Sequence, residues 1–168
     1  MRALYIVLLL GLFFWGYRLC KKNLCPPDAS ASAAAAVSNT EDCDTQLLFK
    51  DGDNLDILSD ENFTFNHSSE ELNELSDDFA SSILDVVDYL MENTDRIIQI
   101  QGYYLDSEDS LEGRNTLGYA RAKEIAKYFS TQGVSRDQVF YAGIKSNELC
   151  VRDSVLMKGC SIDFAGKK

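Results

Sequence analysis

A strand, a helix and a second strand follow one another between residues 96 and 142, and this order constrains the fold more than any other feature of the sequence. Arg96–Tyr104 reads RIIQIQGYY, with Ile98 and Ile100 on one side, as in a strand that packs one face on a core. Gly133 ends the helix that follows, because glycine readily adopts the left-handed conformation that closes a helix. The predicted cap of this helix is Asn115 or Thr116, and its core-facing residues are Leu117, Ala120, Ile125 and Phe129. The strand Val139–Ala142 then completes a β-α-β unit.

The segments on either side extend this unit into a larger alternating pattern. Further strands are predicted at Gln46–Lys50, Asn62–Asn66 and Cys160–Phe164. Ser68–Glu71 has the Ser-x-x-Glu form of a capping box, and apolar residues then recur at helical spacing up to about Glu92. The sequence therefore predicts an α/β sandwich of two layers, in which two crossover helices cover one face of a mixed sheet.

The first 25 residues predict a membrane anchor with a basic flank. The run Ala3–Tyr17 is uncharged, and Arg2 and Arg18 lie on either side of it. Extended by a few residues, this run is long enough for a short transmembrane helix. A cleaved signal peptide, with Ala29–Ala31 as the small-residue cleavage site, is the alternative that stays open.

Residues 26–46 are rich in Ala, Ser and polar residues and lack apolar periodicity, so we expect a linker there and a folded domain at 47–168. The net charge is −11, and the first 25 residues carry four cations and no acid, so the remaining residues carry −15. Such an acidic body repels phosphate, which argues against nucleic-acid binding. The single histidine, His67, gives no basis for a multi-histidine metal site, and no motif implies a cofactor.

Five cysteines suggest an oxidising compartment. Cys150 and Cys160 are ten residues apart and flank a loop before the last predicted strand, so we predict a disulfide between them. The odd number then leaves at least one of Cys20, Cys25 and Cys43 with a free thiol or with a partner in another chain.

The β-α-β unit carries motifs that resemble a known family. Its first strand ends in the turn Gly102–Asp106 (GYYLD), its helix opens with Leu117–Ala122 (LGYARA), and its second strand ends in Phe140–Gly143 (FYAG). These motifs resemble the Gly-aromatic-Thr-Asp turn, the Leu-x-x-x-Arg-Ala helix and the Ala-x-Gly strand end of the OmpA-like, or OmpA/MotB, peptidoglycan-binding domain. The resemblance covers about residues 60–165. Here the turn has one extra residue and lacks the family's Thr, and Met157–Gly159 stands where the family has Asn-Arg-Arg.

The resemblance implies a membrane-tethered, non-catalytic module that anchors a cell-envelope assembly to peptidoglycan, with the diaminopimelate of the stem peptide as ligand. Asp106 and Arg121 are fifteen residues apart, as in the family. We expect them to face each other across a cleft and bind the zwitterionic ligand, so that their replacement leaves melting nearly unchanged. A direct salt bridge between the two is the alternative. Tyr104, Asn115 and Leu117 are the other expected ligand-binding residues.

The resemblance also implies a single-pass membrane protein whose folded domain lies in the periplasm, with outer-membrane association open. The positive charges that follow the apolar run favour the opposite orientation, with the folded domain in the cytoplasm. We give more weight to the resemblance, because the family's ligand lies in the periplasm. The alternative function is a structural or protein-interaction subunit of an envelope complex, in which peptidoglycan binding is weak or lost; the departures from the motifs favour it. An enzyme ranks last, because no residue pair offers a poised acid and base.

Overall fold

The computed structural model describes residues 43–108, 116–146 and 149–167, and the predicted anchor and most of the predicted linker lie outside these ranges. Within these ranges, no helix combines the length and the apolar character that a membrane crossing needs. The elements are β1 (Leu47–Asp51), β2 (Leu55–Ser59), β3 (Phe65–Asn66), α2 (Asp77–Glu92), β4 (Arg96–Tyr104), α3 (Leu117–Thr131), the 3-10 helix η1 (Arg136–Gln138), β5 (Val139–Lys145), β6 (Val151–Arg152), β7 (Val155–Leu156) and β8 (Cys160–Gly166).

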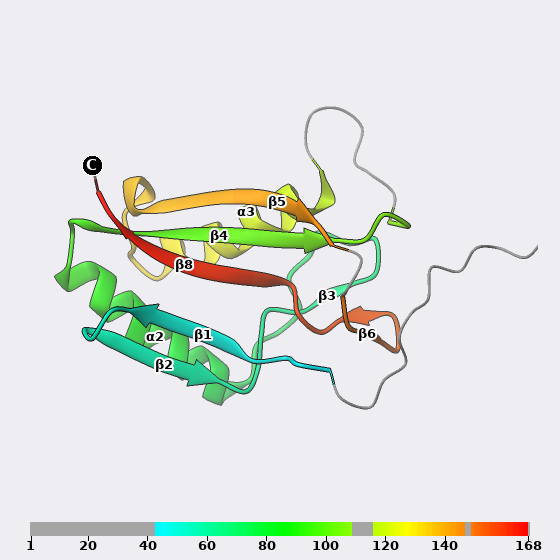
Figure 1. Cartoon of the computed structure of the whole chain (residues 1–168), viewed down its shortest axis with the longest axis horizontal. Helices are drawn as coiled ribbons and strands as arrows, with labels where there is room; N and C mark the ends of the chain where they lie inside the picture. Colours follow the sequence, from blue (N-terminus) through cyan, green and yellow to red (C-terminus); the bar gives the residue numbers. More distant parts are fainter. Residues whose placement is uncertain (1–42, 109–115, 147–148, 168) are drawn as a thin grey trace, which may run out of the picture. The chain divides into compact units, whose positions relative to one another are not determined.

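The predicted β-α-β unit is present and forms the centre of the fold (Figure 1). Strand β4 pairs in parallel with β5 and antiparallel with β8, so the three-stranded sheet is mixed and has the order β5-β4-β8. Helix α3 packs on β4 and β5. Ile98 and Ile100 of β4 are fully buried together with Ile125 and Phe129 of α3, which confirms the apolar pattern of the strand and of the helix.

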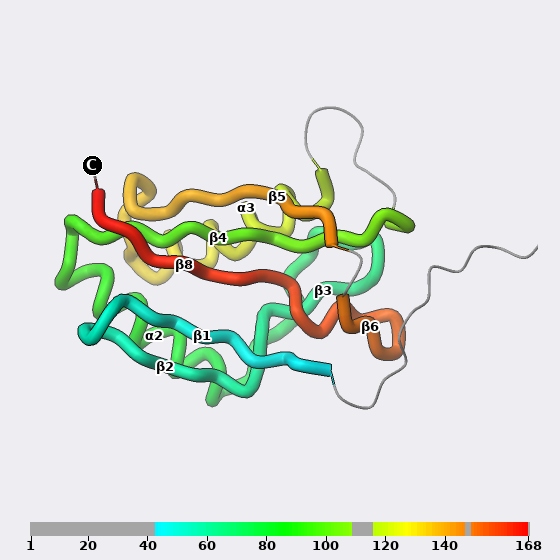
Figure 2. Tube along the Cα trace, in the orientation of Figure 1, coloured from blue at the N-terminus to red at the C-terminus, as the bar shows by residue number. Residues whose placement is uncertain are grey.

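The strands do not form the single mixed sheet that the sequence predicts. The described residues form three sheets: β1-β2, β3-β7-β6 and β5-β4-β8. Strand β1 runs alongside β8 without joining its ladder (Figures 1 and 2). Strand β2 was not predicted, because its five residues, LDILS, show only a weak apolar alternation; in the structure one of the five is buried. Gly52, with a φ of +58°, forms the turn of this hairpin, a conformation that glycine adopts without steric cost.

The first helix begins later than its predicted capping box. Ser68 has a φ of +57°, and the chain stays non-helical until the hydroxyl of Ser76 accepts a hydrogen bond from the amide of Phe79 at 3.1 Å and caps α2. Leu72 and Leu75 reach the core from this non-helical segment. Their spacing matches a helical period, but it reflects two inward-facing residues of an irregular chain.

The second helix has the predicted boundaries. The hydroxyl of Thr116 accepts a hydrogen bond from the amide of Tyr119 at 3.2 Å, so Thr116 is the cap that satisfies this free helical donor. At the other end, Gly133 has a φ of +111° and the amide of Val134 donates to the carbonyl of Phe129. Val134 is buried, which is the hydrophobic contact that accompanies a glycine end.

The disulfide joins Cys43 to Cys150, and the prediction of a Cys150–Cys160 bond is wrong. The Cα atoms of Cys43 and Cys150 are 5.6 Å apart, within the usual range for a disulfide. Cys160 is a free cysteine and is fully buried. It begins β8 opposite Gly102 of β4, and this register turns its side chain into the core.

Candidate functional site at the carboxyl edge of the sheet

The carboxyl ends of β4 and β5 meet at one edge of the sheet, because the two strands are parallel and Tyr104 lies opposite Lys145. Helix α3 begins at the same edge. A Cβ atom on Gly143 would collide with the Thr116 hydroxyl and the Tyr119 amide. The absence of a side chain at Gly143 therefore lets the start of α3 lie directly on β5.

Arg121 is fully buried at this edge, and the fold uses all its donors. Its Nε atom donates to the carbonyl of Ser69 at 2.9 Å. Nη1 donates to the carbonyl of Tyr103 at 2.9 Å and to Glu108 at 3.0 Å, and Nη2 donates to the carbonyl of Asn66 and to Glu108 at 2.6 Å. A guanidinium has five N–H groups, so these five hydrogen bonds satisfy it completely.

Glu108 is the partner of Arg121, and its side chain is 1% exposed. Its carboxylate also accepts hydrogen bonds from the amides of Leu105 at 2.7 Å and Ser68 at 3.0 Å. Burial by itself raises the pKa of Glu108, but the hydrogen bonds from Arg121 and the two amides outweigh burial and hold the pKa below its usual value. Glu108 therefore stays ionised and closes the loop after β4 onto α3.

Asp106 is exposed to solvent and pairs with a residue other than Arg121. It forms an ion pair with Lys145 of β5 at 2.7 Å, with side-chain exposures of 73% for Asp106 and 45% for Lys145. Neither the shared cleft nor the alternative, a direct Asp106–Arg121 salt bridge, describes the structure. Glu108 is the acid that pairs with Arg121. Asp106 and Glu108 are two positions apart in one loop, and the sequence does not indicate which of them lies beside Arg121.

The other three predicted ligand-binding residues have different surroundings. Tyr104 is half-buried, and its ring lies over Gly118, where a Cβ atom would touch its Cδ1 at 2.7 Å. Leu117 is 1% exposed, so its side chain packs inside the molecule. Asn115 lies outside the described residues.

The edge therefore carries two ion pairs of different character. The Arg121–Glu108 pair is buried and saturated, whereas the Asp106–Lys145 pair faces solvent and can exchange its partners for ligand groups of opposite charge. Sequence reasoning missed both Glu108 and Lys145 as residues of this edge. In the part of the chain that the structure describes, no three His, Cys, Asp or Glu side chains gather closely enough to hold a metal ion.

The match to a protein-family model agrees with the motifs. A model of the OmpA family matches residues 64–155, more than half of the chain. The chain is similar to the peptidoglycan-associated lipoprotein from Burkholderia pseudomallei, with 21% identity and a TM-score of 0.46 over 62% of this chain and 88% of that one. It is also similar to the C-terminal domain of MotB from Helicobacter pylori, with 19% identity and a TM-score of 0.47 over 62% and 84% of the two chains. No curated protein matches the sequence.

Proposed function

The chain belongs to the OmpA family, and on this premise we propose that it is a membrane-tethered module that binds peptidoglycan without catalysis and holds a cell-envelope assembly on the wall. The observation that carries the proposal is the exposed Asp106–Lys145 ion pair where β4 and β5 end. It lies at the edge to which the family resemblance assigns the ligand.

The charge of this pair suits the expected ligand. The free centre of diaminopimelate in a stem peptide carries both an ammonium and a carboxylate. Asp106 can accept hydrogen bonds from the ligand ammonium, while Lys145 donates to the ligand carboxylate. Separating the exposed pair costs little, since such pairs contribute about 0–1 kcal/mol. Tyr104 lies next to Asp106's loop and opposite Lys145 in the register, so its ring can cover the bound group.

Arg121 takes a positioning role in this proposal instead of contacting the ligand. Its five hydrogen bonds tie the carbonyls of Asn66, Ser69 and Tyr103 and the carboxylate of Glu108 to α3. Glu108 in turn holds the amide of Leu105, the residue before Asp106. The buried pair therefore fixes the backbone from which Asp106 projects, and Lys145 replaces Arg121 as the ligand's cation.

We place the folded part in the periplasm, with residues 1–25 as a single-pass anchor and residues 26–46 as the linker. The Cys43–Cys150 disulfide supports an oxidising compartment. Membership of the family supports a site at the cell wall. Outer-membrane association and an envelope protein complex as partner are parts of the same proposal.

Co-sedimentation of the full chain with purified sacculi tests the function. Asp106→Asn and Lys145→Gln should each weaken binding about tenfold or more, since each removes one charge-assisted contact of about 1.5–3 kcal/mol. The matched control is the exposed Lys50–Asp56 pair on the β1-β2 hairpin, which also has a distance of 2.7 Å. Asp56→Asn should leave binding unchanged, and free diaminopimelate should compete with the sacculi.

Equal losses in the Asp106 and Asp56 variants would reduce binding to general electrostatics. A folded parent that does not sediment with sacculi would favour the second function, a protein-interaction subunit that retains the OmpA fold. One observation supports this second function. The resemblance assigns Arg121 to the ligand, but its guanidinium is already paired with the carboxylate of Glu108.

A further inference from the structure

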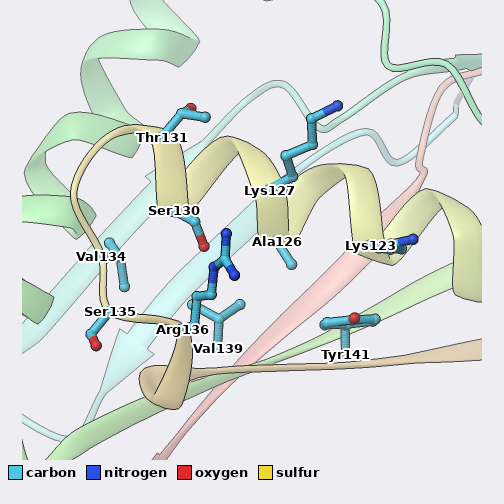
Figure 3. A pocket seen from close by; sticks show the side chains of 10 residues that line it. All are labelled: Lys123, Ala126, Lys127, Ser130, Thr131, Val134, Ser135, Arg136, Val139 and Tyr141. Carbon is cyan, nitrogen blue, oxygen red and sulfur yellow. The ribbon is translucent and has the colours of Figure 1, made fainter.

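A groove lies between α3, η1 and β5 (Figure 3). Neither Asp106 nor Lys145 lines it. It has a volume of about 740 Å³. Helix α3 contributes Lys123 and Lys127, η1 contributes Arg136, and β5 contributes Val139 and Tyr141. In Figure 3 the Arg136 side chain extends into the space between the helix and the strand. The groove is therefore lined by three cations above an apolar floor.

These cations are unusual in a body with a net charge of −15. Among the described residues, Lys123 and Arg136 form no ion pair, and the same holds elsewhere only for Arg152. Lys127 is paired only with Glu124, three residues earlier on the same helix, at 3.0 Å. Cations without acidic partners are available to pair with a ligand, so this groove favours an anionic ligand.

The groove runs along an open edge of the sheet. Within the described residues, β5 pairs with β4 alone, so one side of its backbone is available to another strand. Its side chains alternate: Tyr141 faces α3, where its ring lies 5.2 Å from that of Tyr119, while Phe140 and Ile144 are exposed on the opposite face. A strand added beside β5 would place alternate side chains in the groove and next to these two apolar residues.

We propose that an extended acidic segment of a partner protein adds to β5 as a fourth strand. Carboxylates at alternate positions would lie in the groove against Lys123, Lys127 and Arg136. The intervening side chains would be apolar and would cover Phe140 and Ile144. The main-chain hydrogen bonds of the added strand supply affinity, and the alternating side chains supply specificity.

A peptide fits these observations better than a phosphate polymer or a lipid surface. The groove is hollowed between a helix and a strand, whereas a membrane surface is broad and would meet the acidic residues of the rest of the body. A nucleic acid would meet the same repulsion along its backbone. A peptide can confine its negative charge to one face and present apolar side chains on the other.

The test uses the full chain and a short fluorescent peptide that alternates Glu and Val. Fluorescence anisotropy should show binding that weakens with added salt. The double variant Lys123→Gln/Arg136→Gln should bind about tenfold more weakly, because both unpaired cations of the groove are lost. The matched control is Arg152→Gln, the exposed cation without an ion pair outside the groove, which should bind as the parent does. Amide hydrogen exchange in Val139–Lys145 should slow when the peptide binds.

Three results would overturn the proposal. The first is an equal loss in the Arg152→Gln variant, which would mean that only overall charge matters. The second is equal or tighter binding of anionic vesicles or of a single-stranded oligonucleotide. The third is the absence of peptide binding, or binding without protection of β5. Sacculus binding by the double variant should match the parent, which separates this groove from the peptidoglycan proposal.

Discussion

At the scale of single residues, the buried Arg121–Glu108 pair determines how the loop after β4 is held. Two ions without water are costly, and only good geometry with further hydrogen bonds compensates for their lost hydration. This pair meets that condition, because the guanidinium makes five hydrogen bonds and the carboxylate also accepts two backbone amides. Removing one partner leaves the other charged and unsatisfied in the interior.

We therefore expect Glu108→Ala to lower the free energy of unfolding by about 3–5 kcal/mol, as for other broken buried pairs. Asp106→Ala, two residues earlier in the same loop, should change it by no more than about 1 kcal/mol, because the Asp106–Lys145 pair is exposed. Urea denaturation measures both values. Similar losses in the two variants would contradict the burial argument. Replacing Arg121 should also lower the free energy of unfolding strongly, because it leaves Glu108 charged and unpaired in the interior. This replaces the expectation from the sequence that such variants melt like the parent.

The lowered pKa of Glu108 also predicts how stability depends on pH. A carboxyl whose pKa is lower in the folded state releases its proton more readily there, so the unfolded chain binds more protons and stability falls on acidification. The contribution is complete above the unfolded value, about 4.3 for Glu, and is lost as the pH falls through the lower, folded value.

Glu108→Gln should therefore flatten the dependence of unfolding free energy on pH in this acidic range. Chemical denaturation at a series of pH values measures it. Glu70→Gln, which replaces an exposed glutamate without an ion pair among the described residues, is the control. The same flattening in the control would show that Glu108 is not responsible.

At the scale of elements, glycines let α3 approach β4 closely. A Cβ atom on Gly118 of α3 would collide with the backbone of Gly102 in β4, and a Cβ atom on Gly102 would collide with the backbone of Gly118. Backbone atoms of packed elements cannot move aside as the tip of a long side chain can. The contact therefore fixes the distance of the helix from the sheet and, with it, the position of Arg121.

Gly118→Ala should destabilise the protein although alanine favours a helix. The gain in helix propensity is about 1 kcal/mol, while forcing a methyl group into packed backbone costs about 1–3 kcal/mol or more. Gly166→Ala at the end of β8 is the control, since its Cβ atom would meet only Arg96 at 3.5 Å. Thermal melts should show a lower midpoint for Gly118→Ala alone. An unchanged midpoint would mean that α3 can shift without cost.

The disulfide connects the chain before β1 with the chain before β6 and closes a separation of 107 residues. Peptide mapping without reduction should recover Cys43 linked to Cys150. Cys160 should react with iodoacetamide only after unfolding, because burial raises the pKa of its thiol and shields it. Cys43→Ser should lower stability by about 2–5 kcal/mol. A Cys150–Cys160 peptide in the native protein would contradict this pairing.

At the scale of the whole molecule, residues Val37–Lys168 form one compact unit. Its core combines residues of both helices with residues of the β1-β2 hairpin and of the β5-β4-β8 sheet. The unit includes both cysteines of the disulfide. A core and a cross-link contained in one unit should allow it to fold without the preceding residues.

We therefore expect a chain that begins at Val37 to unfold cooperatively and reversibly under oxidising conditions. Circular dichroism and fluorescence should give coincident transitions, as in a two-state domain. The same fragment after reduction should unfold at a lower denaturant concentration. A fragment without a cooperative transition would show that the first 36 residues contribute to the fold.

The sequence by itself determined the elements whose cause is local. The apolar alternation of β4 and the threonine cap and glycine end of α3 act within a few residues, and all were predictable. The family motifs lie in these same elements. Local pattern predicted less well before α2, where a non-helical segment carries Leu72 and Leu75 at helical spacing. It also did not predict the short strands β2, β6 and β7, which are stabilised by the strands they pair with.

Tertiary structure alone decided which side chains meet. Glu108, and not Asp106, pairs with Arg121, because the loop after β4 turns the carboxylate of Glu108 inward and leaves that of Asp106 beside Lys145. Cys150 bonds to Cys43 because the register of β8 on β4 turns Cys160 into the core. The basic groove likewise exists only where α3 and η1 pass beside β5. Each of these contacts joins residues that lie far apart in the chain, and residues close together in the chain have different partners. Local sequence pattern carries no information about which residues meet in this way.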